Sequence, residues 1–155
     1  MAAPDIPDRT PATARQAWMA VLARADRAAL EAAVAGLDPP PSWTVLRAPE
    51  TGMVMVRGRA GGDGAAFNLG EMTVTRCAVS LACGTIGHAY VAGRDARKTE
   101  LAAVLDALLQ TGAHGPSLRA GLIAEQAARQ QARRQDALRR AAATRVDFFS
   151  MVRMG

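Results

Sequence analysis

Charged residues at the ends of expected strands are the side chains in this sequence that could bind an anion. They are Glu50, Arg59, Arg76, Arg94 and Asp95. An arginine presents a planar fork of donors that grips phosphate or carboxylate, and an arginine within a half-buried strand needs a partner. Two interpretations are open. The one we favour is an internal pair, such as Arg76 with Glu50 or Asp95; the other is contact with an anionic ligand or with a partner's acidic patch.

The residues that could hold a metal ion or act as a nucleophile lack the spacing typical of such sites. Cys77, Cys83, His88 and His114 form neither a CxxC unit nor a close pair of histidines. No GxSxG sequence accompanies the histidines. The glycines of residues 61–64 are not followed by the Lys-Ser/Thr of a phosphate loop and are typical of a turn between strands. We therefore predict no metal, no cofactor bound by this chain and no catalytic residue.

Changes in residue pattern divide the chain into helical and extended regions. Thr10 is a typical helix start, and apolar residues at helical spacing predict a first helix over residues 12–36, ended by the prolines of residues 39–41. Over residues 43–91, short runs rich in Val, Thr, Met and Gly predict strands. Their links are too short for parallel crossovers, so we expect an antiparallel sheet of about four strands.

Two further helices are expected after the sheet. Asp95 is the expected N-cap of a middle helix with a buried leucine stripe. The stripe consists of Leu101, Leu105, Leu108 and Leu109. Residues 117–143, rich in alanine and arginine, predict a long C-terminal helix with a thin apolar face. Two interpretations of this thin apolar face are equally acceptable: the helix packs on another chain, or it is a solvated surface helix. The predicted fold class is α+β, with residues 1–9 as a flexible N-terminus and residues 10–155 as one domain.

The C-terminal tail is more apolar than a chain end usually is, since ends are commonly polar and frayed. Two phenylalanines left in water would forgo about 1.5–3 kcal/mol each. The tail should therefore dock on its own sheet or in a partner's groove, and we favour the partner. The candidate partner contacts are Trp18 and the tail residues Val146, Phe148, Phe149, Met151, Val152 and Arg153.

Composition and charge limit the class of protein. With 155 residues, 50% hydrophobic and 21% charged, the chain has the size and balance of one soluble domain. Its net charge of +5 comes from residues 118–155, where eight arginines meet three acidic residues. Because the expected C-terminal helix, residues 117–143, lacks interleaved aromatics for base stacking, we expect no nucleic-acid partner. No membrane-spanning run, signal-peptide pattern or disulfide framework is evident, so we expect a cytoplasmic protein with free thiols and no membrane contact.

Several short stretches, each weak by itself, form a specific series over essentially residues 10–155. They are Ala14-Arg15-Gln16-Ala17-Trp18-Met19, Val21-Leu22-Ala23, Glu50-Thr51-Gly52, Gly61-Gly62-Asp63-Gly64, Phe67-Asn68-Leu69-Gly70-Glu71, Thr75-Arg76, Gly84-Thr85-Ile86-Gly87-His88, Val91-Ala92-Gly93-Arg94-Asp95, Asp106-Ala107-Leu108-Leu109-Gln110 and Arg145-Val146-Asp147-Phe148-Phe149-Ser150-Met151-Val152-Arg153. In this series the sequence resembles the PhnG family, the G subunit of the carbon-phosphorus lyase machinery of bacterial phosphonate breakdown.

The resemblance implies a place in a multi-subunit complex, with H, I and J subunits in the core and K and L subunits associated. In that family the G, H and I subunits, assisted by L, support displacement of adenine from ATP by a phosphonate such as methylphosphonate. The product is alpha-D-ribose 1-methylphosphonate 5-triphosphate, and the J subunit later breaks the carbon-phosphorus bond. Since the nucleosidase chemistry is assigned chiefly to the I subunit, the resemblance implies an auxiliary, non-catalytic chain with ATP as co-substrate of the complex. The alternative is a subunit that contributes arginines directly to the active site.

Overall fold

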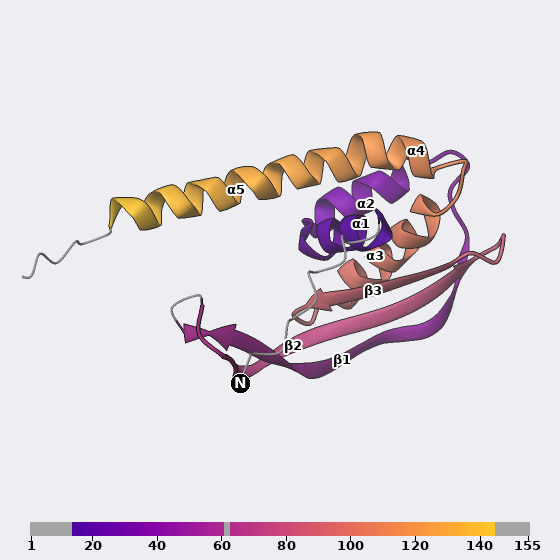
Figure 1. Cartoon of the computed structure of the whole chain (residues 1–155). Coiled ribbons are helices and arrows are strands. Elements are labelled where there is room, and N and C mark those ends of the chain that lie inside the picture. The colour runs from indigo at the N-terminus through magenta and orange to yellow at the C-terminus, as the bar shows by residue number, and fades with distance from the viewer. Residues whose placement is uncertain (1–13, 61–62, 145–155) are drawn as a thin grey trace, which may run out of the picture.

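The protein combines one antiparallel sheet with helices packed mainly on one of its faces (Figure 1). The computed structural model describes residues 14–60 and 63–144. The elements, in chain order, are α1 (Ala14–Arg24), α2 (Arg27–Ala35), β1 (Trp43–Arg59), β2 (Ala66–Leu81), β3 (Ile86–Ala92), α3 (Ala96–Leu109), α4 (Gly115–Leu118), the π-helical segment η2 (Arg119–Ile123) and α5 (Ala124–Ala143). The predicted α+β class is confirmed.

The sheet has three strands in the order β1-β2-β3, one fewer than the approximate number expected. Its antiparallel pairing is confirmed. The difference arises at Glu50-Thr51-Gly52, which looks like a turn in sequence but lies within β1, where Glu50 pairs with Arg76 and Thr51 with Thr75. Register shifts just before Glu50 absorb the extra residues as bulges, so the strand bends without reversing direction.

The single N-terminal helix expected over residues 12–36 is two helices in the structure. Asp26 has an extended backbone, with φ −75° and ψ 139°, and it precedes the first residue of α2. Because an extended residue cannot continue a helix, the chain changes direction there, and Leu22 of α1 and Leu30 of α2 both reach the core. The predicted start at Thr10 lies outside the described residues.

Helix α3 forms the centre of the core, and the predicted cap and leucine stripe are confirmed. The Asp95 side chain accepts a hydrogen bond of 2.9 Å from the Lys98 backbone N–H. All four leucines of the stripe are buried, and so is every other residue between Leu101 and Leu109, because α3 is covered by the sheet on one side and by α1 and α2 on the other. From the sheet, the alternate residues Cys77 and Val79 of β2 and Ala89 and Val91 of β3 face these helices.

The predicted C-terminal helix is also confirmed, as a helical path from α4 through η2 to α5. Helix α5 has twenty residues, and Gln126 is the only one of them that is buried. Figure 1 shows α5 extending well beyond the other helices. Within residues 14–60 and 63–144, no helix is long and apolar enough to cross a membrane.

Gly87 of β3 is expected to be essential, because α3 packs directly over its Cα. A Cβ at this position would clash with the Ala103 carbonyl oxygen and lie 2.7 Å from the Ala107 backbone nitrogen. Gly87→Ala should therefore lower the melting temperature by roughly 5–10 °C. Gly70→Ala in β2, where a Cβ would meet nothing within 4 Å, is the matched control. Equal melting temperatures for the two variants would contradict this packing.

Candidate functional site

Glu50 and Arg76 form an ion pair on the face of the sheet that points away from the helices. Arg76 Nε donates to Glu50 Oε2 at 3.1 Å, and Arg47 Nη1 lies 3.8 Å from the same oxygen. The favoured interpretation, an internal pair of Arg76 with Glu50, is confirmed. Both side chains are about half exposed, so the pair contributes at most about 1 kcal/mol to stability. With Tyr90 of β3, the pair lines a shallow polar hollow of about 210 Å³.

The other three predicted anion-binding residues lie away from this pair. Arg59 is nine residues further along β1, about 30 Å in an extended strand, and it donates to the Gly64 carbonyl oxygen at 3.0 Å. Asp95 caps α3, and its Oδ2 lies 3.7 Å from Arg27 Nη1. Arg94 forms no ion pair with any residue in the described part of the chain. The structure therefore brings Glu50 and Arg76 together and does not combine the five residues into one site.

The cysteines and histidines do not form a common centre either. Cys77 belongs to the helix-facing row of β2 and His88 to the exposed row of β3, so their side chains point to opposite faces of the sheet. Burial raises the pKa of the Cys77 thiol, whereas the Thr85 hydroxyl lowers the pKa of the exposed Cys83 thiol by a hydrogen bond. No cluster of three or more potential metal ligands occurs within residues 14–60 and 63–144.

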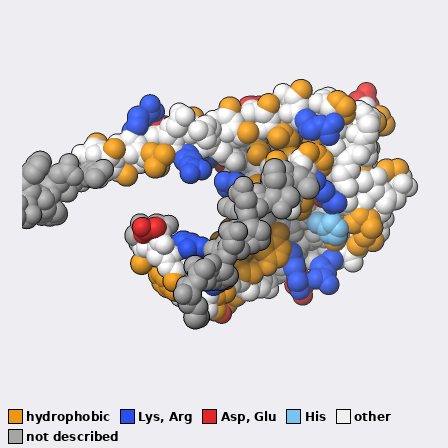
Figure 2. All heavy atoms as spheres, viewed as in Figure 1, with side chains coloured by type: hydrophobic (Ala, Val, Ile, Leu, Met, Phe, Trp, Pro, Cys, Tyr) orange, Lys and Arg blue, Asp and Glu red, His pale blue; other side chains and the backbone are white. Residues whose placement is uncertain are grey.

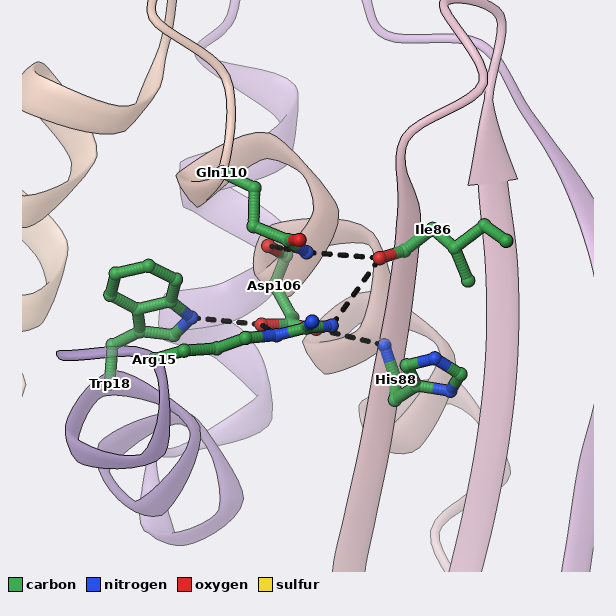
Figure 3. A network of polar contacts seen from close by, with 6 residues as sticks. All are labelled: Arg15, Trp18, Ile86, His88, Asp106 and Gln110. Carbon is green, nitrogen blue, oxygen red and sulfur yellow. Dashed lines mark hydrogen bonds and ion pairs between the residues drawn. The ribbon is translucent and has the colours of Figure 1, made fainter. Parts of the chain in front are cut away.

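A buried polar network around Asp106 is the most densely hydrogen-bonded site in the described part of the protein, and sequence reasoning missed it. The carboxylate lies in the middle of α3 and is 0% exposed. Arg15 holds it with two donors, Nη2 at 2.7 Å from Oδ2 and Nε at 3.2 Å from Oδ1. The Trp18 indole N–H donates to Oδ1 at 2.8 Å, and the His88 backbone N–H donates to Oδ2 at 2.9 Å. Figure 3 shows these donors converging from α1 and β3 on one carboxylate.

Gln110 and Arg15 extend this network along the edge of β3. The Gln110 side-chain amide donates to the Ile86 carbonyl oxygen at 2.9 Å, and Arg15 Nη2 lies 3.4 Å from the same oxygen. The hydrogen bond to Asp106 raises the pKa of the Arg15 guanidinium, so the group stays charged. Because the carboxylate is fully enclosed, it cannot reach a substrate. Its function is to attach α1 and β3 to α3.

Trp18 belongs to this network, which corrects its assignment as a partner contact. The side chain is 8% exposed, bonded to Asp106 and covered by the Arg119 guanidinium at 5.8 Å from the ring centroid. Its surface is therefore buried within the chain itself and is not available to a partner. The other candidate contacts, Val146 to Arg153, lie outside the described residues.

A sequence signal for the network did exist. Arg15, Trp18, His88, Asp106 and Gln110 all occur in the stretches that carry the family resemblance. Moreover, Asp106 is an acidic residue within a helical stripe that is otherwise apolar. A charged residue in such a position needs a buried partner, but the sequence does not reveal that the partner is an arginine 91 residues away.

We expect Asp106→Asn to destabilise the protein by about 2 kcal/mol, since it leaves the partly exposed Arg15 guanidinium and one buried N–H donor without the carboxylate oxygen that satisfies them. Glu50→Gln, which removes a half-exposed carboxylate also paired with arginine, is the matched control and should cost less than about 1 kcal/mol. Urea denaturation of both variants measures the difference. Equal losses for the two variants would show that the Asp106 network does not dominate stability.

Comparison with known proteins gives one consistent result. The family model described as "Phosphonate metabolism protein PhnG" matches residues 13–154. The chain is also 47% identical, over 139 residues, to the "Alpha-D-ribose 1-methylphosphonate 5-triphosphate synthase subunit PhnG" of Rhizobium meliloti (strain 1021). That alignment covers 90% of this chain and 88% of the relative. Since the match spans the Asp106 network, the sheet and the helical C-terminal region, the chain belongs to the PhnG family of phosphonate metabolism proteins.

Proposed function

We propose that this chain is an auxiliary, non-catalytic subunit of a complex that forms alpha-D-ribose 1-methylphosphonate 5-triphosphate from ATP and methylphosphonate with release of adenine. The observation that carries the proposal is the 47% identity, over 90% of the chain, to a relative named as a subunit of that synthase. The arrangement of the polar residues supports it. The most densely bonded carboxylate, Asp106, is sealed inside the fold, and the anion-binding candidates are dispersed over the surface.

Helix α5 supports a role in assembly. An α-helix of this length is about 30 Å long, and a helix normally buries one face against its own domain. In the first half of α5, Gln130 donates to the Val21 carbonyl oxygen and Arg133 lies 3.5 Å from Asp26, so this half packs on the described N-terminal helices. In the second half Leu138 is exposed, and neither Arg134 nor Arg140 forms an ion pair with a described residue. This half of α5 is suited to contact another subunit.

We propose the H, I and J subunits of the carbon-phosphorus lyase core as partners, with K and L associated. The second half of α5 and the tail residues 146–152 are the proposed contacts. The hollow beside Glu50 and Arg76, at about 210 Å³, is too small to enclose a nucleotide, so this pair alone does not form a nucleotide site.

The tail can be tested directly. Replacing Phe148 and Phe149 with Ala should release this chain from co-expressed partner subunits, because an interface loses the most when a buried aromatic side chain is truncated. The melting temperature of the free chain should remain nearly unchanged. Leu46→Ala, which truncates an exposed side chain of β1, is the control and should co-purify normally. A large loss of monomer stability with intact assembly would show that the tail docks on its own domain instead.

The proposal as a whole is tested by reconstitution. The partner subunits, mixed with ATP and methylphosphonate, are assayed for adenine release with and without this chain. Release that depends on the chain supports an auxiliary subunit. Full release in its absence would refute the proposed function.

The alternative, an anion-binding subunit that contributes arginines to the active site, is supported only by the exposed Glu50 and Arg76 pair. Arg59, Arg94 and Asp95 remain candidates in that alternative, although each would have to act from a different part of the surface. We expect isothermal titration of the isolated chain with ATP and with methylphosphonate to give no heat beyond dilution. Binding heat that disappears in Arg76→Ala would favour the alternative over the auxiliary subunit.

A further inference from the structure

A mostly apolar hollow of about 420 Å³ lies at the end of the sheet where β2 turns into β3. Three segments that are distant in sequence form its walls: residues 41–42 before β1, residues 81–83 at the turn, and residues 111–114 after α3, together with Leu108. Figure 1 shows the links that contain these segments at the same end of the molecule. A hollow of this size, with apolar walls and a few polar groups, is typical of a small-molecule site. We call it the turn hollow.

Two of the side chains that line the turn hollow have groups that can take part in covalent chemistry. They are the exposed thiol of Cys83 and the half-buried imidazole of His114. The cysteines and histidines of the chain do not form one centre, but this pair shares a wall of the same hollow. Among the described residues that line it, none is Lys, Arg, Asp or Glu, so Cys83 and His114 are its titratable groups.

A rigid turn holds Cys83 in place. Gly84 has a φ of +85°, which favours glycine, and its N–H donates to the Leu81 carbonyl oxygen at 2.8 Å. The Leu81 N–H donates to the Thr85 carbonyl oxygen at 2.9 Å. Cys83 Sγ lies 3.3 Å from the Thr85 hydroxyl oxygen, and this hydrogen bond lowers the pKa of the thiol. Since the thiolate is the nucleophilic form of cysteine, the turn favours reaction near neutral pH.

His114 is fixed by its backbone and has an available ring. Its N–H donates to Thr111 Oγ1 at 3.3 Å, and its carbonyl oxygen accepts from the Leu118 N–H at 3.0 Å. The imidazole forms no hydrogen bond or ion pair with any residue of the described part of the chain. An imidazole beside a cysteine commonly accepts the thiol proton, and the resulting cation then favours the thiolate.

Cys77 is an internal reference for these features. Its side chain is 3% exposed, and its thiol donates to the Arg47 carbonyl oxygen at 3.3 Å. Burial raises the pKa of this thiol. Buried cysteines with such surroundings are unreactive, so the two cysteines of the chain should differ strongly in reactivity.

We propose that the turn hollow is a covalent modification site, in which Cys83 exchanges with a low-molecular-weight disulfide and His114 assists the thiol. Because the walls are apolar and carry no fixed charge, the site suits disulfides with small, neutral organic groups. This inference goes beyond the proposed function and does not depend on it.

The reaction needs no oxidant other than the disulfide itself. Cys83 Sγ attacks one sulfur of RS–SR, an S–S bond forms between them, and the original S–S bond breaks. Its electron pair leaves on the second sulfur as RS⁻, which receives the proton that His114 took from the thiol. The products are the mixed disulfide Cys83–S–SR and the thiol RSH, so the reaction is reversed by an excess of thiol.

The test uses the full, folded chain at neutral pH. One sample receives bis(2-hydroxyethyl) disulfide, which is small and neutral, and another receives oxidised glutathione, which is larger and anionic. Mass mapping locates the adducts, and a peptide of residues 79–87 gives the rate of the same thiol without the hollow. We expect the neutral disulfide to modify Cys83 at least about fivefold faster than the peptide, and oxidised glutathione to show no such advantage. The rate should also rise at a lower pH than that of the peptide, because the pKa of the Cys83 thiol is lowered.

Two variants test the part played by the imidazole. His114→Ala should slow the reaction of Cys83 with the neutral disulfide at least about threefold. His88→Ala is the matched control, because His88 is exposed on β3 and does not line the turn hollow, and it should react like the wild-type chain. Equal rates for the His114→Ala and wild-type chains would overturn the proposal.

A further comparison does not depend on any variant. Cys77 should remain unmodified in the folded chain and react once urea has unfolded it. Modification of Cys77 and Cys83 at similar rates in the folded chain would overturn the inference. So would a Cys83 that reacts with both disulfides at the rates of the peptide, because it would then be an ordinary surface thiol.

Discussion

The fold depends on one buried carboxylate. Asp106 of α3 accepts hydrogen bonds from Arg15 and Trp18 of α1 and from the backbone of β3, and thereby joins three elements that are distant in sequence. An enclosed carboxylate is costly to remove from water, and here that cost is offset by an arginine with two donors and by two further N–H groups. The same interactions satisfy part of the free edge of β3, which would otherwise expose unpaired backbone groups.

The placement of α3 also explains why other parts of the chain remain uncovered. This helix lies between the sheet and the pair α1 and α2, so the core is complete around it. Within residues 14–60 and 63–144, no comparable packing covers the far end of the β1–β2 ribbon, residues 53–59 and 66–73, or the second half of α5. The helices α1, α2 and α3 and the sheet beneath them therefore form a complete core. The far end of the β1–β2 ribbon and α5 extend from this core and carry exposed apolar side chains. Figure 2 shows open space between α5 and the end of the ribbon. Such a division suits a chain that completes its packing within an assembly.

Local features were predictable where local physics decides them. The Asp95 cap, the leucine stripe of α3, the extent of the C-terminal helix and the pair of Arg76 with Glu50 all follow from neighbouring residues or from the need of a charge for a partner. The break at Asp26 and the passage of Glu50-Thr51-Gly52 through a strand were not predictable in the same way. In both places several local conformations are acceptable, and the contacts of Leu30 and the pairing with β2 select one of them.

The sequence by itself determined the class of the fold, the position of most helices and, through its resemblance to a family, the functional setting of the protein. These depend on periodicity, caps and residue order, which are properties of the linear chain. Tertiary structure alone decided that Trp18 is a core residue and that the predicted anion-binding residues are dispersed. It also decided that hydrophobic side chains at the far end of the β1–β2 ribbon, such as Phe67 and Leu69, lie outside the core. Each of these depends on which residues meet across long separations, because a side chain acquires its burial and its partners only when the sheet and the helices close around it.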